Sequence, residues 1–291
     1  MARTVVITGT STGIGRAAAE RMAAEGWTVY AGVRSDADAD RVKNEVAGDV
    51  RPVLLDVTNG DHIAALVATL GDELGDGGLD GLVNNAGVAE AGPVETVSDE
   101  EWRWHFEVNV FGLVSLTRAC LPLLRAGKGR VVNVGSIAGR VASPLMAPYS
   151  AGKHAVEAIS ESLRFEVADF GMHVSCVEPG EIKTAIWAKG DDRMAQLMAS
   201  LDADTIARYD RHIDTMHGFL ADGAKRGIPA SKVSDVIHHA LTASRPKHRY
   251  LVGADAKMAG IASHLPDRLR ARALSSYSAR WTRAGRKLRA R

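Results

Sequence analysis

The sequence predicts an α/β fold in which a doubly wound, Rossmann-type parallel sheet forms a single domain. Short runs of β-branched and other apolar residues alternate along the chain with longer stretches of helical period. The strand-like runs are apolar at nearly every position, which suits strands that helices cover on both faces. The chain has 291 residues, 46% hydrophobic and 24% charged, so a disordered chain and a collagen-like repeat are excluded.

Each element follows from a local pattern. Strands are expected where apolar, mostly β-branched residues run together, at residues 4–8, 27–33, 52–56, 79–84, 130–134, 173–177 and 249–252. Helices are expected at residues 13–25 and 150–170. A further helix should begin near Ser98, because Ser98-Asp99-Glu100-Glu101 has the spacing of a capping box. Repeated strand, helix and strand predict βαβ units.

Residues 185–227 interrupt this alternation with a helix-prone, methionine-rich insertion that contains Met194, Met198 and Met216. Two interpretations are open, a packed helical insertion and a lid over an apolar substrate, since methionine fills irregular apolar surfaces. No linker rich in proline, glycine or serine divides the chain. We therefore expect one domain over residues 1–267, with residues 185–227 as its substrate lid.

The C-terminal tail, residues 268–291, is strongly basic. It carries nine basic residues and no acidic one, which leaves 27 basic and 35 acidic residues elsewhere, a net charge of −8. Apolar residues recur in the tail at helical spacing, as in Leu274, Trp281 and Leu288. Such an amphipathic helix could pack on the acidic body or a second subunit, lie on an anionic membrane surface, or contact nucleic acid. Nucleic acid is not expected, because the body has no recognised nucleic-acid motif.

Several classes of protein are excluded by what the sequence lacks. Two cysteines, Cys120 and Cys176, are too few for a disulfide framework and do not have metal-ligand spacing, so no metal is expected. The sequence has no run of about 18 apolar residues, so no membrane span is expected. The first strand begins at Thr4 and leaves no room for a signal peptide. We expect a cytoplasmic protein that could lie at the membrane surface through its tail.

A glycine-rich loop with the spacing G-x-x-x-G-x-G connects the first strand to the first helix. Glycine lets the backbone turn tightly and approach a pyrophosphate, whose charge is held by N–H groups at the helix N-terminus. The position between strand and helix makes this reading much stronger than three glycines alone. We expect the loop to bind a dinucleotide through Gly9, Ser11, Thr12, Gly13, Ile14 and Gly15.

The end of the second strand indicates which dinucleotide binds. A carboxylate there pairs with the ribose hydroxyls of NAD, whereas an arginine accommodates the 2′-phosphate of NADP. Here Val33 stands where the acid would be, and Arg34 follows it. NADP is therefore favoured and NAD stays open, since Arg34 could also be a solvated loop charge.

Two further strand ends carry candidate cofactor contacts. Asp56 and Val57 close the third strand, where the carboxylate could reach the adenine edge, cap the next helix, or do both. Asn85, Ala86 and Gly87 follow the fourth strand, where small residues let the backbone pass beside the cofactor ribose.

The candidate catalytic residues are Tyr149, Lys153, Ser136 and Asn109. Tyr149 and Lys153 are four residues apart, on one face of a helix. A phenol is a poor base at neutral pH, but a nearby ammonium and a positive nicotinamide ring favour the phenolate. Ser136 ends the fifth strand and could orient a substrate oxygen toward Tyr149. The amide of Asn109 could interrupt its helix and hold a water that relays protons to Lys153.

These motifs, in this order, resemble the short-chain dehydrogenase/reductase family over residues 4–184. The resemblance implies an Asn–Ser–Tyr–Lys tetrad at Asn109, Ser136, Tyr149 and Lys153, with Tyr149 and Lys153 also touching the cofactor. The family's P-G-x-x-x-T element, which grips the nicotinamide, falls on Pro179, Gly180, Ile182 and Thr184. It implies an NAD(P)-dependent oxidoreductase that interconverts an alcohol and a ketone or aldehyde, assembled as a homodimer or homotetramer.

A finer resemblance is to the branch of retinol and hydroxysteroid dehydrogenases, carried by residues 30–34, 55–58, 165–180 and 245–253. It implies a bulky apolar, steroid-, retinoid- or lipid-like substrate, lined by residues 141–148 and the insertion. Two alternatives stay open. One is a ketoacyl-type reductase of acyl thioesters, and the other is a non-catalytic protein that senses dinucleotides. The substrate, the direction and the stereochemistry are not determined by the sequence.

Overall fold

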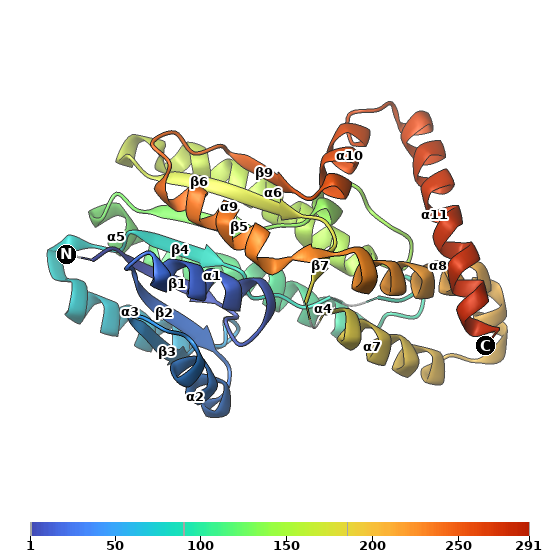
Figure 1. Cartoon of the computed structure of the whole chain (residues 1–291), viewed down its shortest axis with the longest axis horizontal. Helices are drawn as coiled ribbons and strands as arrows, with labels where there is room; N and C mark the ends of the chain where they lie inside the picture. The colour runs from blue at the N-terminus through green and yellow to red at the C-terminus, as the bar shows by residue number, and fades with distance from the viewer. Residues whose placement is uncertain (1, 90, 185, 291) are drawn as a thin grey trace.

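The computed structural model of the chain describes residues 2–89, 91–184 and 186–290 and confirms the Rossmann-type sheet (Figure 1). Seven parallel strands form one sheet in the order β3-β2-β1-β4-β5-β6-β9. They are β1 (Thr4–Thr8), β2 (Thr28–Val33), β3 (Val50–Leu54), β4 (Gly81–Asn84), β5 (Arg130–Val134), β6 (His173–Pro179) and β9 (Arg249–Val252). The order reverses between β1 and β4, and doubly wound sheets bind their ligands at such a switch point.

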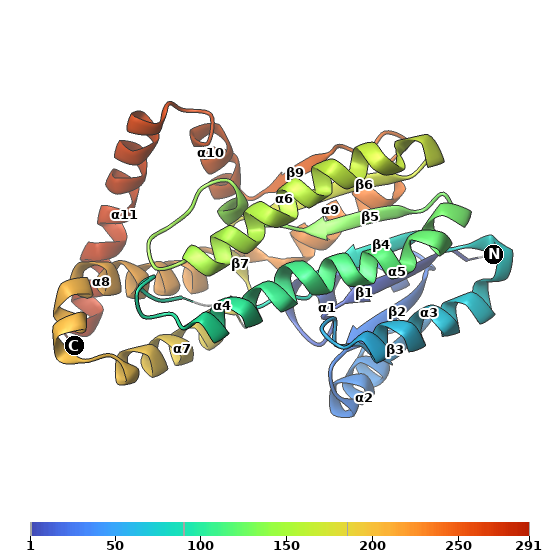
Figure 2. The same cartoon turned by 180° about the vertical axis from the view of Figure 1, so that it is seen from behind.

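Helices cover both faces of the sheet, which Figures 1 and 2 show from opposite sides. One face is covered by α1 (Gly13–Ala24), α2 (Asp36–Glu45) and α9 (Ala230–Thr242), and the other by α3 (Gly60–Leu74), α5 (Gly112–Ala126) and α6 (Ala147–Val167). Successive strand residues point to opposite faces, so Val5 and Ile7 join the first core and Val6 the second. Both cores consist of buried apolar side chains, and this explains why β1 is apolar on both sides.

Several element boundaries differ from those expected by one to three residues, and β3 and α6 show why. β3 begins at Val50 and includes Pro52, which is tolerated because β3 lies at the edge of the sheet. α6 begins at Ala147, three residues earlier than expected, with Pro148 in its first turn, where a missing N–H costs nothing. Tyr149 and Lys153 therefore both lie within the first two turns of α6.

One continuous helical stretch runs through α4 (Asp99–Phe106), a π-helical turn (Glu107–Phe111) and α5. The expected capping box is present, since the Ser98 hydroxyl accepts from the Glu101 N–H and the Glu101 carboxylate accepts from the Ser98 N–H. By length and composition alone this stretch could cross a membrane, contrary to the expectation from apolar runs. Half of its most apolar window is buried inside the protein, and Leu116 lies in the second core, which is the packing of a core helix.

The remaining helices lie beyond the carboxyl ends of the strands (Figure 1). The expected insertion forms α7 (Ile186–Ser200) and α8 (Ala203–Arg226), and its first residue, 185, lies outside the described residues. A small second sheet joins β7 (Ile182–Lys183) to β8 (Ile228–Pro229), at the two ends of the insertion. After β9 come α10 (Ala254–Ala262) and α11 (Asp267–Arg289), which contains nearly all of the basic tail.

The tail helix α11 packs along α8 of the same chain. A Cβ at Gly285 would lie 1.7 Å from the carbonyl oxygen of Asp214, so the two backbones touch at this glycine. The Asp214 side chain is 3% exposed and accepts hydrogen bonds from Arg286 and Arg289. The Trp281 indole N–H donates to Asp222 at 3.0 Å. The acidic residues of α8 thus neutralise part of the basic tail.

Candidate active site

The glycine loop forms a close-fitting cradle between β1 and α1. Gly9 and Gly13 have φ of +67° and +64°, in the left-handed region that glycine adopts without strain. A Cβ at Gly15 would lie 2.2 Å from the carbonyl oxygen of Gly9, so only glycine fits there. The Thr12 side chain does not cap α1. The first backbone N–H groups of α1 can therefore donate hydrogen bonds to an anion bound in the loop. The cradle therefore fits the pyrophosphate of a dinucleotide.

Asn85 fastens the cradle to the end of β4. Its amide Nδ2 donates to the carbonyl oxygens of Thr8 and Gly9 at 2.8 and 3.1 Å. The Thr8 hydroxyl accepts from the backbone N–H groups of Asn85 and Ala86. Four hydrogen bonds thus hold the ends of β1 and β4 together, and the importance of Thr8 shows only in the folded chain.

Arg34 lies exposed at the end of β2, and Asp56 lies nearby after β3. Burial raises the pKa of the Asp56 carboxyl, but hydrogen bonds from Thr58 and the positive charge of Arg34 outweigh burial, so the pKa is lower than usual. Asp56 does not cap α3, which was one of its expected roles. Asn59 is the cap, since its side chain accepts from two backbone N–H groups in the first turn of α3.

The structure brings the candidate catalytic residues together at the carboxyl ends of β4 and β5. Lys153 Nζ donates to the carbonyl oxygen of Val134 at 2.8 Å and lies 5.8 Å from the centre of the Tyr149 ring. Ser136 follows β5 directly, and its hydroxyl accepts from the Ala138 N–H at 3.1 Å. A buried ammonium, a phenol and a hydroxyl thus share one end of the sheet, as proton transfer to a substrate oxygen requires.

Asn109 lies at the centre of the π-helical turn, so the helix is interrupted at this residue as expected. Its side chain joins the helix to the end of β4, because Oδ1 accepts from the Val88 N–H at 3.1 Å. A Cβ at Gly87 would lie 2.7 Å from the same Oδ1, which explains the glycine.

His105, which the sequence does not single out, is part of this site. Its side chain is fully buried, and its ring lies nearly parallel to that of Tyr149, with centroids 6.1 Å apart. Burial and, less strongly, the charge of Lys153 lower the pKa of His105 to about 4. The sequence could have pointed to His105 through its position four residues before Asn109, which puts both residues on the same face of the helix.

The P-G-x-x-x-T element bridges β6 and the glycine loop. The Thr184 side chain lies 3.3 Å from where a Cβ of Gly13 would be, and Ile182 pairs with Ile228 in the small sheet. The Glu181 N–H donates to Asp255 at 2.6 Å. Burial, with the negative charges of Asp255 and Asp222, raises the pKa of Glu181 to about 7.

A buried polar network lies one turn behind Lys153. Glu157 accepts from the Cys176 thiol and from Arg249, both at 2.9 Å. Glu178 is fully buried beside Arg140, and burial and the nearby Glu157 raise its pKa. This network ties α6, which carries Tyr149, to β6 and β9.

An apolar cluster joins the insertion to the loop before α6. Leu145 packs with Met194, Ile213, Met216 and Leu220, all buried. The two segments expected to line an apolar substrate therefore lie against each other beside the site.

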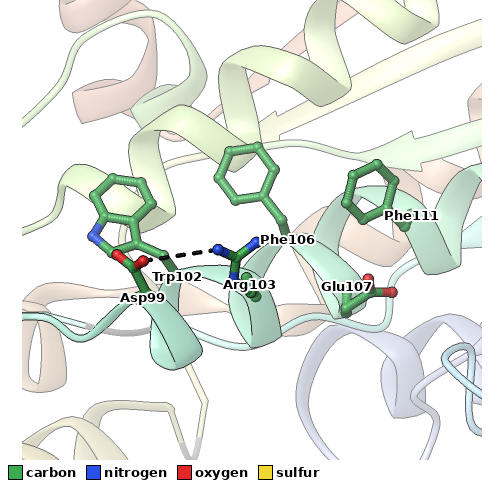
Figure 3. Close-up of a pocket in the computed structure, with 6 residues that line it drawn as sticks. All are labelled: Asp99, Trp102, Arg103, Phe106, Glu107 and Phe111. Carbon is green, nitrogen blue, oxygen red and sulfur yellow. Dashed lines mark ion pairs between the residues drawn. The ribbon is translucent and has the colours of Figure 1, made fainter.

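A separate hollow of about 440 Å³ lies along the α4–α5 stretch and contains none of the candidate catalytic residues (Figure 3). Trp102, Phe106 and Phe111 follow one another along it, and Phe111 is 53% exposed. The candidate active site is thus defined by the sheet's switch point and not by this hollow.

Known proteins are similar to this chain in sequence. A family model described as short chain dehydrogenase matches residues 3–195. The NADPH-dependent 3-dehydrocapnine reductase of Ornithobacterium rhinotracheale is 37% identical over 273 residues, which cover 92% of this chain and 94% of the relative. The 17-beta-hydroxysteroid dehydrogenase type 6 of Bos taurus is 37% identical over 271 residues, covering 91% and 85%.

A solved structure has the same fold. The short chain dehydrogenase from Burkholderia cenocepacia in complex with NADP has a TM-score of 0.71 and 27% identity, over 94% of this chain and 96% of that one. The parallel sheet, the glycine cradle and these matches along almost the whole chain agree. This chain belongs to the short-chain dehydrogenase/reductase family.

Proposed function

We propose that the protein is an NADP-linked oxidoreductase that interconverts a bulky apolar alcohol and its ketone or aldehyde, with Tyr149 as general acid and base. The observation that carries the proposal is the grouping of Tyr149, Lys153 and Ser136 beside the glycine cradle at the switch point of the sheet. Binding, positioning and proton transfer can all take place there.

The chain's own residues would position the substrate and move its proton. The cofactor, when bound, accepts or donates a hydride. Tyr149 takes the proton of the alcohol in one direction and returns it to the carbonyl in the other. Ser136 orients the substrate oxygen by a hydrogen bond. Lys153, anchored on the Val134 carbonyl, stabilises the negative charge on the phenol oxygen.

The preference for NADP rests on Arg34. It is exposed at the end of β2, where Val33 leaves no carboxylate to pair with ribose hydroxyls, and the first relative above is named as NADPH-dependent. Losing a charge-assisted contact of about 1.5–3 kcal/mol should weaken NADPH binding about 10- to 100-fold in Arg34→Glu and leave NADH binding nearly unchanged. Lys43→Glu, with the same charge change on α2, is the control. Fluorescence titration measures both affinities, and equal loss of NADPH and NADH binding would contradict the proposal.

The substrate class rests on the apolar cluster around Leu145 and Met216, which α7, α8 and the loop before α6 form together. We propose that α7 and α8 are the lid over an apolar substrate. Turnover is measured with a panel of steroid ketones, retinal, long-chain ketones, acyl thioesters and small polyols. Activity on polyols alone would refute an apolar site, and activity on acyl thioesters alone would favour the ketoacyl-type reductase.

Tyr149→Phe tests whether the site is catalytic. The variant should lose nearly all turnover and keep NADPH affinity within about twofold, because only the phenol oxygen is removed. A variant with normal turnover would place the chemistry elsewhere.

We further propose that the protein is a homo-oligomer that associates through the outer faces of α5 and α6. Phe111, in the π-helical turn directly before α5, and Phe165, on α6, are 53% and 71% exposed, and large exposed aromatic side chains mark association surfaces. Phe111→Asp together with Phe165→Asp should shift the sedimentation coefficient toward that of a monomer. Unchanged sedimentation would exclude this face.

We also propose a cytoplasmic enzyme that touches anionic membranes, supported by two unpaired cysteines and by the corner between α10 and α11. One face of the tail is already packed on α8, but Met258 and Ile261 on α10 are 63% and 72% exposed, and the exposed Arg268 and Arg272 follow at the start of α11. Co-sedimentation with phosphatidylglycerol vesicles should be lost in Ile261→Asp. Equal binding by both proteins would refute membrane contact at this corner.

A further inference from the structure

His105 lies against the ring of Tyr149. It occupies the last turn of α4, and its side chain has no exposed surface. The two rings are inclined by only 10°, with centroids 6.1 Å apart, in the range of offset-stacked pairs. Lys153 Nζ lies 5.8 Å from the same phenol ring. The phenol is thus contacted by an ammonium and by the flat side of an imidazole.

The imidazole lies against the Asn109 amide, and its burial favours the neutral form. Asn109 Nδ2 lies 2.8 Å from Nδ1 and 3.2 Å from Nε2 of His105, so the amide packs against the imidazole at both ring nitrogens. The low pKa of His105, caused by burial and by Lys153, agrees with a neutral ring at physiological pH. Val88 holds Asn109 in turn, donating to Oδ1 at 3.1 Å and presenting its carbonyl oxygen 3.0 Å from Nδ2. A connected row of groups therefore runs from the end of β4 to the phenol.

We propose that His105 is a positioning residue for the reaction, whose flat, neutral ring sets the plane of the Tyr149 phenol. This inference rests on the proposed role of Tyr149 in proton transfer. The phenol oxygen has to meet the substrate oxygen within hydrogen-bond distance, and misplacing a reacting group by about 1 Å can cost about 100-fold in rate. The neutral ring also fills the space beside Lys153 without adding a second positive charge.

Two variants of the full chain separate the flat ring from its nitrogen atoms. His105→Phe keeps a flat ring and removes both ring nitrogens, whereas His105→Leu removes the ring and fills the site with an apolar side chain. With the ketone of highest turnover from the panel above, we expect kcat to fall about 10- to 100-fold in His105→Leu and less than about threefold in His105→Phe. The KM for NADPH and the melting temperature should change little in both.

The pH dependence of kcat distinguishes positioning from a purely structural role, because a residue needed only for folding would leave it unchanged. Its midpoint should shift in His105→Leu, because the phenol no longer keeps its distance from Lys153, and stay in place in His105→Phe. The NMR signal of the Tyr149 ring carbon that carries the hydroxyl is assigned by its loss in Tyr149→Phe. Measured without substrate, its chemical shift should change in His105→Leu and stay in place in His105→Phe.

The outcomes distinguish this inference from the function on which it rests. If Tyr149→Phe retains turnover, the proposed function is wrong. If Tyr149→Phe is inactive while His105→Leu matches the wild type in kcat and in its pH midpoint, only the role of His105 is overturned. Equal impairment of the Phe and Leu variants would also overturn it, because the flat ring would then not be what acts.

Discussion

Replacing Gly285 by alanine should separate the tail helix α11 from α8. The new Cβ would lie 1.7 Å from the Asp214 carbonyl oxygen and 2.6 Å from its carbonyl carbon. Non-bonded heavy atoms pack best at about 3.5–4.0 Å, so the helices have to part by roughly 2 Å. The obstacle is backbone on both sides, which cannot rotate away as a side chain would.

The expected cost follows from two opposing effects. Overpacking costs about 1–3 kcal/mol, and a contact this short belongs at the upper end. Alanine regains about 1 kcal/mol over glycine inside a helix. We therefore expect a net loss of about 2 kcal/mol in the free energy of unfolding. The melting temperature should fall by about 4 °C or more.

Thermal unfolding and hydrogen exchange measure this effect. The amides of α8 and α11 should lose protection in Gly285→Ala, while the central strands keep theirs. Gly71→Ala is the matched control, since Gly71 lies inside α3 with nothing within 4 Å of its missing Cβ. That variant should gain up to about 1 kcal/mol. If both variants are stabilised, the close contact of α8 and α11 does not exist and the reasoning is refuted.

Three other predictions test the cofactor cradle, the lid junction and α4. Gly15→Ala would place a Cβ 2.2 Å from the Gly9 carbonyl oxygen. A fluorescence titration should show NADPH binding weakened at least about tenfold. An unchanged affinity would contradict dinucleotide binding by the glycine loop. Because the pKa of Glu181 is raised to about 7, its contribution to stability is lost as the pH rises through 7. Glu181→Gln should therefore match the wild type in urea unfolding near pH 4.5 and exceed it at pH 8, and a constant difference would argue against burial of this carboxyl. Ser98→Ala should cost about 1 kcal/mol by removing the cap of α4, whereas Glu101→Gln, which can still accept in the capping box, should cost less in the same thermal melts.

Local patterns predicted the elements around the sheet with small errors. Seven strands were expected, and all seven are found in the main sheet, because strands buried on both faces are apolar at nearly every position. The capping box at Ser98 placed the start of α4 correctly. The strand expected at residues 52–56 lies two residues earlier, at Val50–Leu54, and Pro52 is tolerated inside it because β3 is at the edge of the sheet.

The candidate site was predictable where its residues lie in short motifs. The glycine loop, Tyr149 with Lys153, and Ser136 each stand next to an element boundary that the sequence reveals. Contacts between distant segments were not predictable in this way. Thr8 and Asn85 are 77 positions apart, and Glu181 and Asp255 are 74 apart, yet each pair is joined by a hydrogen bond.

The sequence by itself determined the class of fold, the family and the chemistry at one end of the sheet, because these depend on periodicity and on motifs of a few residues. Only the tertiary structure decided that His105 stacks on Tyr149 and that the basic tail neutralises the aspartates of α8. A histidine or an arginine looks the same in sequence whether it is solvated or buried. Its role is set by the groups that folding brings within a few ångströms, and those come from distant parts of the chain.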